Sequence, residues 1–470
     1  MKVSIPALSL KWFNLVAFLC AFCCVACKSG HKNEIGKMRE SVAVPLTAAY
    51  ENRFAISPDG TRVVHAPIDV SVWDGDRGRP FEVRDANTSG KIADIHLPIR
   101  PARGYSVNSI QFCDRGKYLL LNATLDYDPV QSPKSENPQG PKAAVDYLRV
   151  VDTKSYTLRT DISLSAAGDA VPNGVLAQSR RGYEDGAVRS YVVCAANAPF
   201  AAVVTGHSFG PIGIRIFNLE TGAEVTQFND VLSRSDELGV AISPDATNLA
   251  VFGPQQLQDM KDTKGVNYQI TIVDLRTKKV ARDIYVKSPF NFNSMKYAGE
   301  STIAIELFDR GPSESPPVSW TGLRNYFYTR ASIHFFDVGS GAELRTISQP
   351  DNGDFRLLGI SADGQTILVR TDTTHFCFSC NGGGGQEIIS DSRFTLLKLQ
   401  AGHPITRSPS LKVVHHGCLL PRWLTSGGFL GSCIAFDEEP ELELSQGGNA
   451  VAALWKQGNQ PILVYNLPSQ

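Results

Sequence analysis

The sequence predicts an all-β fold, and three observations lead to this prediction. Two short strand patterns alternate along the chain, each built around a tight turn. Glycine (40 residues) and proline (27 residues) are spread along all 470 positions, as many tight turns require. The patterns combine into seven four-stranded antiparallel units, and a single unit of this kind cannot cover its own apolar faces. Stacking the units radially covers those faces, so we predict a seven-bladed β-propeller.

The first pattern is an apolar strand, a turn of the Ser-Pro-Asp-Gly type, and a second apolar strand. Proline and glycine supply the backbone angles of a tight turn, and aspartate can hydrogen-bond the backbone that follows it. Its clearest copies cover residues 54–64, 239–246 and 358–364. Weaker copies cover residues 110–116, 295–299, 442–448 and, in a degenerate form, 192–204.

The second pattern is an alternating strand that in most copies ends in Asp or Asn and is followed by a polar turn. Period-two alternation with β-branched and aromatic residues suits a half-buried strand. The copies cover residues 81–85, 148–152, 214–218, 270–274, 333–337, 394–398 and 462–466. Six of them are followed by another short strand.

The seventh unit has no fourth strand, because its third strand covers 462–467 and only three residues follow. Sheets avoid open edges of this kind. Residues 41–46 alternate, are of strand length and have no partner in the first unit. We therefore predict that 41–46 pairs with 462–467 and closes the ring, an outer position at which Pro45 is tolerated.

The long irregular segments all fall in two classes of connection, which lie on one face of a propeller. They join second to third strands, or one blade to the next. They cover residues 125–146, 253–267, 309–329 and 371–391 in the first class, and 166–190 and 408–432 in the second. Because loops carry function more often than strands do, we expect a ligand or partner face here. Loop growth without function is the alternative.

The first 26 residues are predicted to be a signal peptide. Residues 12–26 form an uncharged, mostly apolar run that is too short for a comfortable membrane span. Val25-Ala26-Cys27 resembles the bacterial lipobox, which implies that Cys27 is lipidated and becomes the N-terminus. Cys24 stands where that motif usually has Leu, and cleavage without lipid is the alternative. We expect residues 27–40 to form a tether and 41–470 to form the propeller.

Six cysteines follow the leader, and in an oxidising compartment they are expected to form disulfides. Cys377 with Cys380 is the first candidate pair, and Cys418 with Cys433 is the second. A zinc site is one alternative interpretation of the Cys-x-x-Cys motif, and unpaired thiols are the other. The further zinc ligands would be His375, His415, His416 and Cys418.

Composition and motifs exclude several other functions. Lys and Arg total 46 and Asp and Glu total 47, so nothing favours nucleic acid as a partner. No nucleophile elbow, P-loop or His-Glu-x-x-His motif is present. Glycines 382–385 follow a cysteine loop rather than a strand entering a helix, which makes them a poor phosphate cradle. We predict no catalytic residue, no cofactor and no metal outside the zinc alternative.

The chain resembles the bacterial β-propellers of the YVTN and WD40-like groups across roughly residues 41–470. The Ser-Pro-Asp-Gly turn and the strand ending in Asp carry this resemblance, which implies the fold but hardly the function. It departs from true WD40 repeats, because Gly206-His207 stands alone and Trp73-Asp74 lies in a predicted loop. Cys27 is followed by Lys28 rather than by Asp. By resemblance to enteric lipoproteins, this implies a location at the outer membrane.

Two functions are compatible with this resemblance. The first is a non-enzymatic, envelope-anchored binding module that presents the loop-rich face to a protein or cell-wall partner. The propeller lipoprotein of the outer-membrane barrel-assembly machinery is similar in combining an anchor with a propeller. The alternative is a propeller enzyme, lactonase-like or dehydrogenase-like, with its site at the central channel. Carboxylates and histidines at the channel mouth would favour the enzyme, and an apolar loop-face patch would favour binding.

Overall fold

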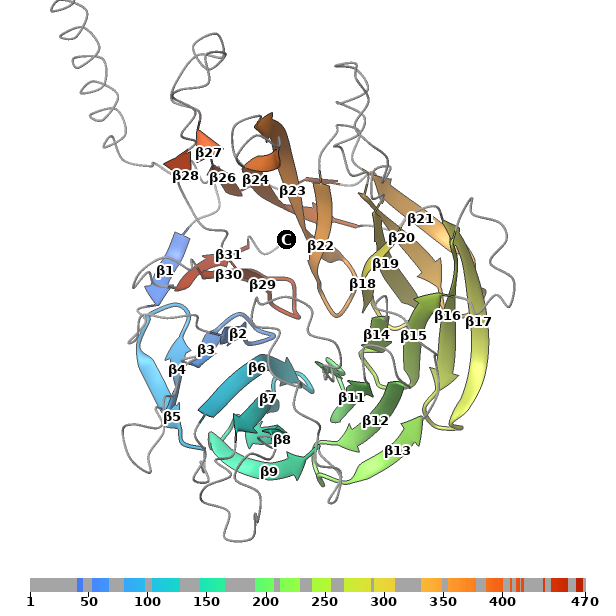
Figure 1. Ribbon diagram of the computed structural model, residues 1–470. Coiled ribbons are helices and arrows are strands. Elements are labelled where there is room, and N and C mark those ends of the chain that lie inside the picture. Colours follow the sequence, from blue (N-terminus) through green and yellow to red (C-terminus); the bar gives the residue numbers. More distant parts are fainter. Residues whose placement is uncertain are drawn as a thin grey trace, which may run out of the picture.

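The computed structural model describes nineteen segments of the chain, and the structural statements below refer to them. They are residues 40–44, 53–66, 80–97, 104–126, 144–164, 191–206, 212–228, 239–254, 266–288, 291–308, 331–348, 354–377, 386–399, 406–407, 411–414, 416–417, 434–435, 441–454 and 462–467. The strands form seven antiparallel sheets arranged in a ring (Figure 1), so the predicted seven-bladed β-propeller is confirmed.

The first four blades each contain four strands that follow one another along the chain, from the innermost to the outermost. Blade 1 contains β2 (Arg53–Ile56), β3 (Arg62–Ala66), β4 (Phe81–Asp85) and β5 (Lys91–Ile95). Blade 2 contains β6 (Gly104–Cys113), β7 (Tyr118–Asp126), β8 (Ala144–Asp152) and β9 (Thr157–Ser163). Blade 3 contains β10 (Tyr191–Cys194), β11 (Phe200–Gly206), β12 (Ile212–Asn218) and β13 (Glu224–Phe228). Blade 4 contains β14 (Gly239–Ile242), β15 (Asn248–Pro254), β16 (Val266–Asp274) and β17 (Lys279–Ser288).

The last three blades keep the same order with two variations at their outer strands. Blade 5 contains β18 (Asn291–Tyr297), β19 (Thr302–Phe308), β20 (Ala331–Asp337) and β21 (Glu343–Ser348). Blade 6 contains β22 (Asp354–Ile360), β23 (Thr366–Cys377) and β24 (Gln386–Lys398), with β25 (Thr406–Arg407) and β26 (Leu411–Val414) sharing the outer position. Blade 7 contains β29 (Glu441–Leu444), β30 (Ala450–Leu454), β31 (Ile462–Asn466) and, at its outer edge, β1 (Glu40–Val44). A separate small sheet joins β27 (His416–Gly417) to β28 (Ile434–Ala435).

The inner hairpins are fixed by the recurring Ser-Pro-Asp-Gly turn. In blade 1 the Asp59 carboxylate accepts hydrogen bonds from the Ser57 hydroxyl (2.5 Å) and the Thr61 backbone (3.1 Å). The Ser57 hydroxyl in turn accepts from the Arg62 backbone at 2.9 Å. Gly60 takes a left-handed φ of 71°, which glycine adopts without steric penalty. Short side chains therefore set the register before any long-range contact forms.

The hydrophobic core lies between the sheets rather than within any one of them. Seven clusters of buried residues occur in the described chain, and each joins two neighbouring blades. Ala55 and Val64 of blade 1, for example, pack with Leu119 and Val151 of blade 2. Burial of this apolar surface stabilises the ring by about 25 cal/mol per Å². One cluster joins blade 7 back to blade 1, so the core is continuous around the disc.

The N-terminal strand closes the ring as predicted. β1 pairs antiparallel with β31, with Val42 opposite Val464 and Val44 opposite Ile462. Figure 1 shows this blue strand beside the red strands of the last blade. The strand begins at Glu40, one residue earlier than expected, and Pro45 lies outside the described residues.

One expected loop is a strand pair instead. The segment 371–391 was predicted to be irregular, but β23 extends to Cys377 and β24 begins at Gln386, with these two residues opposite each other. Residues 373–377 are threonines, aromatic residues and Cys, which suit an extended strand once a partner strand is available. Eight residues, including the four glycines, remain between the strands. No helix in the described chain has the length and apolarity that crossing a bilayer requires.

Candidate functional site

The two faces of the disc differ in the lengths of the connections that leave them. On one face, strands are joined by turns such as the five residues between Ile56 and Arg62. On the other face, 17 residues separate β7 from β8, 22 separate β19 from β20, and 27 separate β9 from β10. We call these the turn face and the loop face. The predicted asymmetry of connections is therefore confirmed, while the structure of the long segments lies outside the described residues.

On the turn face, backbone hydrogen bonds between neighbouring turns join four pairs of adjacent blades in the described chain. They run from Ala362 to Gln446, from Gly447 to Pro58, from Asp114 to Ala195 and from Asn197 to Pro244, at 2.7 to 3.1 Å between donor and acceptor. Blades 5 and 6 approach so closely that a Cβ at Gly364 would lie 2.5 Å from the carbonyl carbon of Ala298. The turns therefore hold neighbouring blades together on this face.

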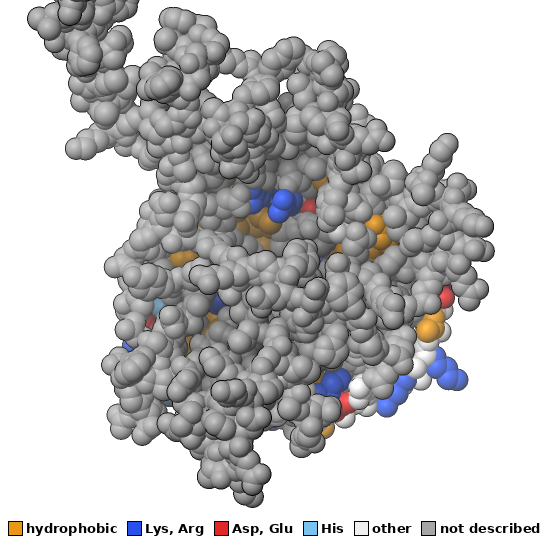
Figure 2. All heavy atoms as spheres, in the orientation of Figure 1, with side chains coloured by type: hydrophobic (Ala, Val, Ile, Leu, Met, Phe, Trp, Pro, Cys, Tyr) orange, Lys and Arg blue, Asp and Glu red, His pale blue; other side chains and the backbone are white. Residues whose placement is uncertain are grey.

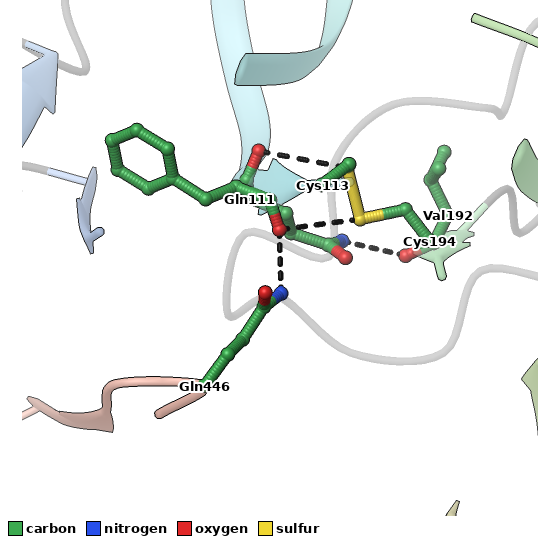
Figure 3. Close-up of a disulfide and its surroundings, with 6 residues drawn as sticks. Gln111, Cys113, Val192, Cys194 and Gln446 are labelled. Carbon is green, nitrogen blue, oxygen red and sulfur yellow. Dashed lines mark hydrogen bonds between the residues drawn. A yellow bond between two sulfur atoms is a disulfide. The ribbon is translucent and has the colours of Figure 1, made fainter. Parts of the chain in front are cut away.

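A disulfide joins blades 2 and 3 at the turn-face end of their innermost strands (Figure 3). Cys113 ends β6 and Cys194 ends β10, with their Cα atoms 5.8 Å apart. The Gln446 amide of blade 7 donates to the Phe112 carbonyl beside it at 2.6 Å. Sequence analysis did not propose this pair. The sequence did contain an indication of this disulfide, because the two cysteines occupy similar positions in consecutive repeats.

The cysteines singled out from the sequence cannot be paired from the structure. Cys377 ends β23, and only its backbone is described. Cys27, Cys380, Cys418 and Cys433 lie outside the described residues. The side chain of His375, in β23, is not described either, so both the disulfide and the zinc interpretations remain predictions. Among the described residues, no group of three or more His, Cys, Asp or Glu side chains could hold a metal ion.

The innermost strands of the seven blades surround the central channel. Each contacts its neighbours in turn, and β29 contacts β2 to complete the circle. Alternate residues of these strands differ in exposure. Phe54, Met295 and Leu444 are buried in the core, whereas Arg53, Lys296 and Glu443, one position away, keep accessible surface. We call this second set the channel set.

The positions of the channel set fall into two levels along the axis of the ring. Two residues share a level when they pair with equivalent positions on the second strands of their blades. The level nearer the loop face contains Arg53, Ser109, Ser294, Arg356 and Glu441, while the equivalent backbone positions of blades 3 and 4 are Tyr191 and the buried Gly239. The middle level contains Gln111, Val193, Lys296, Gly359 and Glu443, while the equivalent positions of blades 1 and 4 are Ala55 and Ala241, which are buried in the core between blades. All charged members come from blades 5, 6, 7 and 1, and we call this part of the channel its charged wall.

The charged wall contains acidic and basic groups in close contact. The Arg53 guanidinium lies 3.3 Å from the Glu441 carboxylate across the boundary between blades 1 and 7. Glu306, which is 1% exposed, accepts hydrogen bonds from the Ser294 hydroxyl (2.9 Å) and the Leu357 backbone (3.0 Å). Glu306 thereby joins blade 5 to blade 6 directly behind the channel.

Lys296 and Glu443 occupy equivalent positions two blades apart, and their environments shift their pKa values in opposite directions. Burial raises the pKa of Glu443 well above its usual range, and the charge of Glu441 raises it further. A hydrogen bond from the backbone N–H of Ile56 and the charge of Lys296 act in the opposite direction. Burial lowers the pKa of Lys296, against the attraction of Glu306 and Glu443. Opposite shifts of this kind are common where acid and base groups are used for function.

Gly359 of blade 6 stands between Lys296 and Glu443 at the middle level. A Cβ there would lie 3.0 Å from the Leu444 Cβ, so a larger side chain would crowd this position. Figure 2 shows a hollow over the strands of blades 6 and 7, in which Lys or Arg side chains are exposed beside acidic and hydrophobic ones.

Comparisons with known proteins do not assign a family. No family description matches the sequence, and no curated protein matches it. Among solved structures, Kuenenia stuttgartiensis hydrazine synthase is 12% identical, with 94% of this chain and 99% of that chain covered and a TM-score of 0.46. An oligogalacturonate lyase in complex with manganese is 12% identical, with 89% of each chain covered and a TM-score of 0.45. A mitotic checkpoint complex structure is 11% identical, with 91% of each chain covered and a TM-score of 0.43. Identities this low carry no information on activity.

Proposed function

We propose that this protein is an exported, envelope-anchored binding module that presents its loop face to a protein or cell-wall partner. The observation that carries the proposal is the difference between the two faces. The turn face is hydrogen-bonded from blade to blade, whereas the long connections all leave from the loop face. A rigid ring that positions long segments on one side is a common architecture for recognition.

The Cys113–Cys194 disulfide supports export. Disulfides persist in oxidising compartments such as the periplasm and are rare where glutathione keeps thiols reduced. This agrees with the leader sequence and the lipobox-like Val25-Ala26-Cys27. The proposal places a lipid on Cys27 and the protein at the outer membrane, with residues 27–40 as a tether that β1 connects to the rim of blade 7.

Site-specific photo-crosslinking in intact cells tests which face is used. A photoreactive amino acid would replace His96 or Ser348, which are exposed where outer strands end toward the loop face. Matched controls would replace Lys154 or Arg276, which are exposed on turns of the opposite face. We expect a discrete crosslinked species from the first pair alone. Equal crosslinking from both pairs, or crosslinking from the control pair only, would refute a loop-face partner.

A catalytic role at the channel is the second candidate, and Lys296 with Glu443 favours it. Lys296 and Glu443 occupy equivalent positions of two innermost strands, and their pKa values shift in opposite directions, as those of acid and base groups in a proton-transfer reaction often do. Such a reaction first requires that a small molecule bind in the channel.

A further inference from the structure

We propose that two copies of this chain pair through β17, the outermost strand of blade 4, and so join two propellers by one continuous sheet. β17 lies at the rim of the ring (Figure 1), and no described strand pairs with its outer edge. The proposed pairing is antiparallel and centred on Tyr285. It goes beyond the proposed loop-face partner and does not depend on it.

The outer edges of blades 1 to 5 differ in the length of regular strand that they offer to a partner. In each of these blades a β-bulge interrupts the outer strand near its first residues, and a bulge makes an edge less suitable for pairing. Beyond the bulge, three or four residues stay in register with the third strand in blades 1, 2, 3 and 5. In β17 seven residues do so, 282–288. Blade 4 therefore has the longest regular open edge of the five.

β17 also exposes apolar side chains beside this edge. Five large hydrophobic residues of the described chain are exposed; two of them lie on β17, and no other strand carries more than one. Tyr285 has the largest exposed fraction of the five, at 64%, and it is the central residue of the regular segment. Tyrosine is enriched in protein interfaces, and an exposed apolar edge is a template for pairing with another chain. The edge of β17 is therefore suited to contact a further strand.

The edge of β17 is complementary in charge to a second copy of itself. Side chains alternate along a strand, so residues 283, 285 and 287 share one face. The exposed Asp283 carboxylate is held on this face by Thr271 and Gln269, which both donate to its Oδ1 atom at 2.8 Å. In an antiparallel pairing about Tyr285, Asp283 of each copy lies opposite Lys287 of the other. Two pairs of unlike charge and one aromatic pair then face each other, and such cross-strand pairs stabilise antiparallel sheets.

The charges also select one register. Among the symmetric registers of the segment beyond the bulge, only the one centred on Tyr285 uses all seven residues and places unlike charges opposite each other. A centre at Asp283 or Lys287 would place like charges against each other, which destabilises a strand pair. A centre at Ile284 or Val286 would leave both charges opposite uncharged residues. The register about Tyr285 instead places Ile284 opposite Val286, beside the core that both form with blade 5.

Cysteine crosslinking of the purified full chain tests both the interface and its register. Tyr285→Cys places two thiols on facing residues, whose Cβ atoms lie about 4.5 to 5.5 Å apart, so mild oxidation should yield a disulfide-linked dimer on a non-reducing gel. Leu344→Cys, on the neighbouring outer strand β21, is a control of similar exposure and should stay monomeric, as should the unsubstituted chain. Asp283→Cys should also stay monomeric, because its two copies would lie about 13 Å apart along the strand. Equal dimer yields from the three variants, or a product that is not two copies of this chain, would overturn the proposal.

Charge reversal tests the same pairing without a new thiol. Asp283→Lys places lysines opposite each other in the dimer and Lys287→Asp places aspartates there, so each variant alone should self-associate at least about 10-fold more weakly than the wild type. Mixing the two variants brings unlike charges together again and should restore the dimer, which also shows that both variants fold. Sedimentation velocity measures each state. A wild type that stays monomeric at micromolar concentrations, or a mixture that dimerises no better than its components, contradicts the proposal.

Discussion

Individual buried ionisable residues make the stability of this protein dependent on pH. His65 is 2% exposed within blade 1, and its Nε2 lies 3.6 Å from the nearest carboxylate oxygen of Glu82. Neither ring nitrogen has a hydrogen-bond partner among the described residues. Burial lowers the pKa of His65, and the charge of Arg84 lowers it further, whereas the charge of Glu82 raises it. The folded protein therefore holds His65 in its neutral form where the unfolded chain would be protonated.

This linkage predicts a loss of stability in mild acid. Below about pH 6.5 the unfolded chain binds a proton at His65 that the folded protein does not, so the free energy of unfolding decreases as pH falls toward the lowered pKa. His65→Gln should remove this part of the pH dependence, as measured by urea unfolding at pH 5 and pH 7.5. The exposed His96→Gln should keep the wild-type dependence. Identical behaviour of the two variants would refute the assignment.

At the scale of the element, strands are joined by a disulfide and by backbone hydrogen bonds. The sequence patterns predicted the β1–β31 pairing but not the disulfide. The Cys113–Cys194 disulfide closes a segment of 81 residues between blades 2 and 3. A crosslink over this separation restricts the unfolded chain, and removing a native disulfide typically lowers stability by about 2 to 5 kcal/mol.

We therefore expect Cys113→Ser with Cys194→Ser to lower the free energy of unfolding by about 2 to 4 kcal/mol in non-reducing urea titrations. Non-reducing peptide mapping of the wild type should find the two cysteines in one linked species. Free-thiol labelling of Cys113 in unfolded, unreduced protein would contradict this expectation. The same mapping tests the predicted pairs Cys377–Cys380 and Cys418–Cys433, and stoichiometric zinc would support the rival interpretation.

The β1–β31 pairing makes a second prediction at the scale of the element. Deleting 40–44 removes the outer strand of blade 7 and exposes the edge of β31. Each lost hydrogen bond lowers stability by about 0.5 to 1.5 kcal/mol, so we expect a loss of about 2 to 5 kcal/mol and a lower melting temperature. Deleting residues 28–38, which the proposal places in the tether, serves as the control and should change the melting temperature little. A larger effect of the control deletion would refute the closure.

The whole molecule is a closed ring with two different faces, and β1 forms the outer edge of the closing blade. The proposed tether directly precedes β1 in the sequence. A ring closed by strands from both chain ends can resist separation of its blades when it is attached through one of them.

Cys27→Ser should move the protein from the membrane fraction to the soluble fraction, since the proposed lipid is attached to that sulfur. Cys24→Ser, three residues earlier, is a matched control that should stay in the membrane fraction. Mass spectrometry of the mature wild-type protein should find an acylated Cys27 at the N-terminus. An unmodified N-terminus, or one at another residue, would contradict the anchor.

The sequence alone determined the number of blades, the strand order within them and the role of the N-terminal strand. These features depend on local signals: turns such as Ser57-Pro58-Asp59-Gly60 fix their own hairpins, and an unpaired seventh edge requires a partner. The extension of β23 to Cys377 was missed because its residues resemble a loop until β24 pairs with them.

The tertiary structure decided which distant residues meet. Cys113 pairs with Cys194, and Lys296 faces the same channel as Glu443, because ring closure brings equivalent positions of separate blades to one axis. Nothing in the residues near Lys296 indicates that Gly359 and Glu443 will be its neighbours. A repeat pattern encodes the geometry of one blade, whereas the chemistry of the channel arises from the positions at which the seven blades differ.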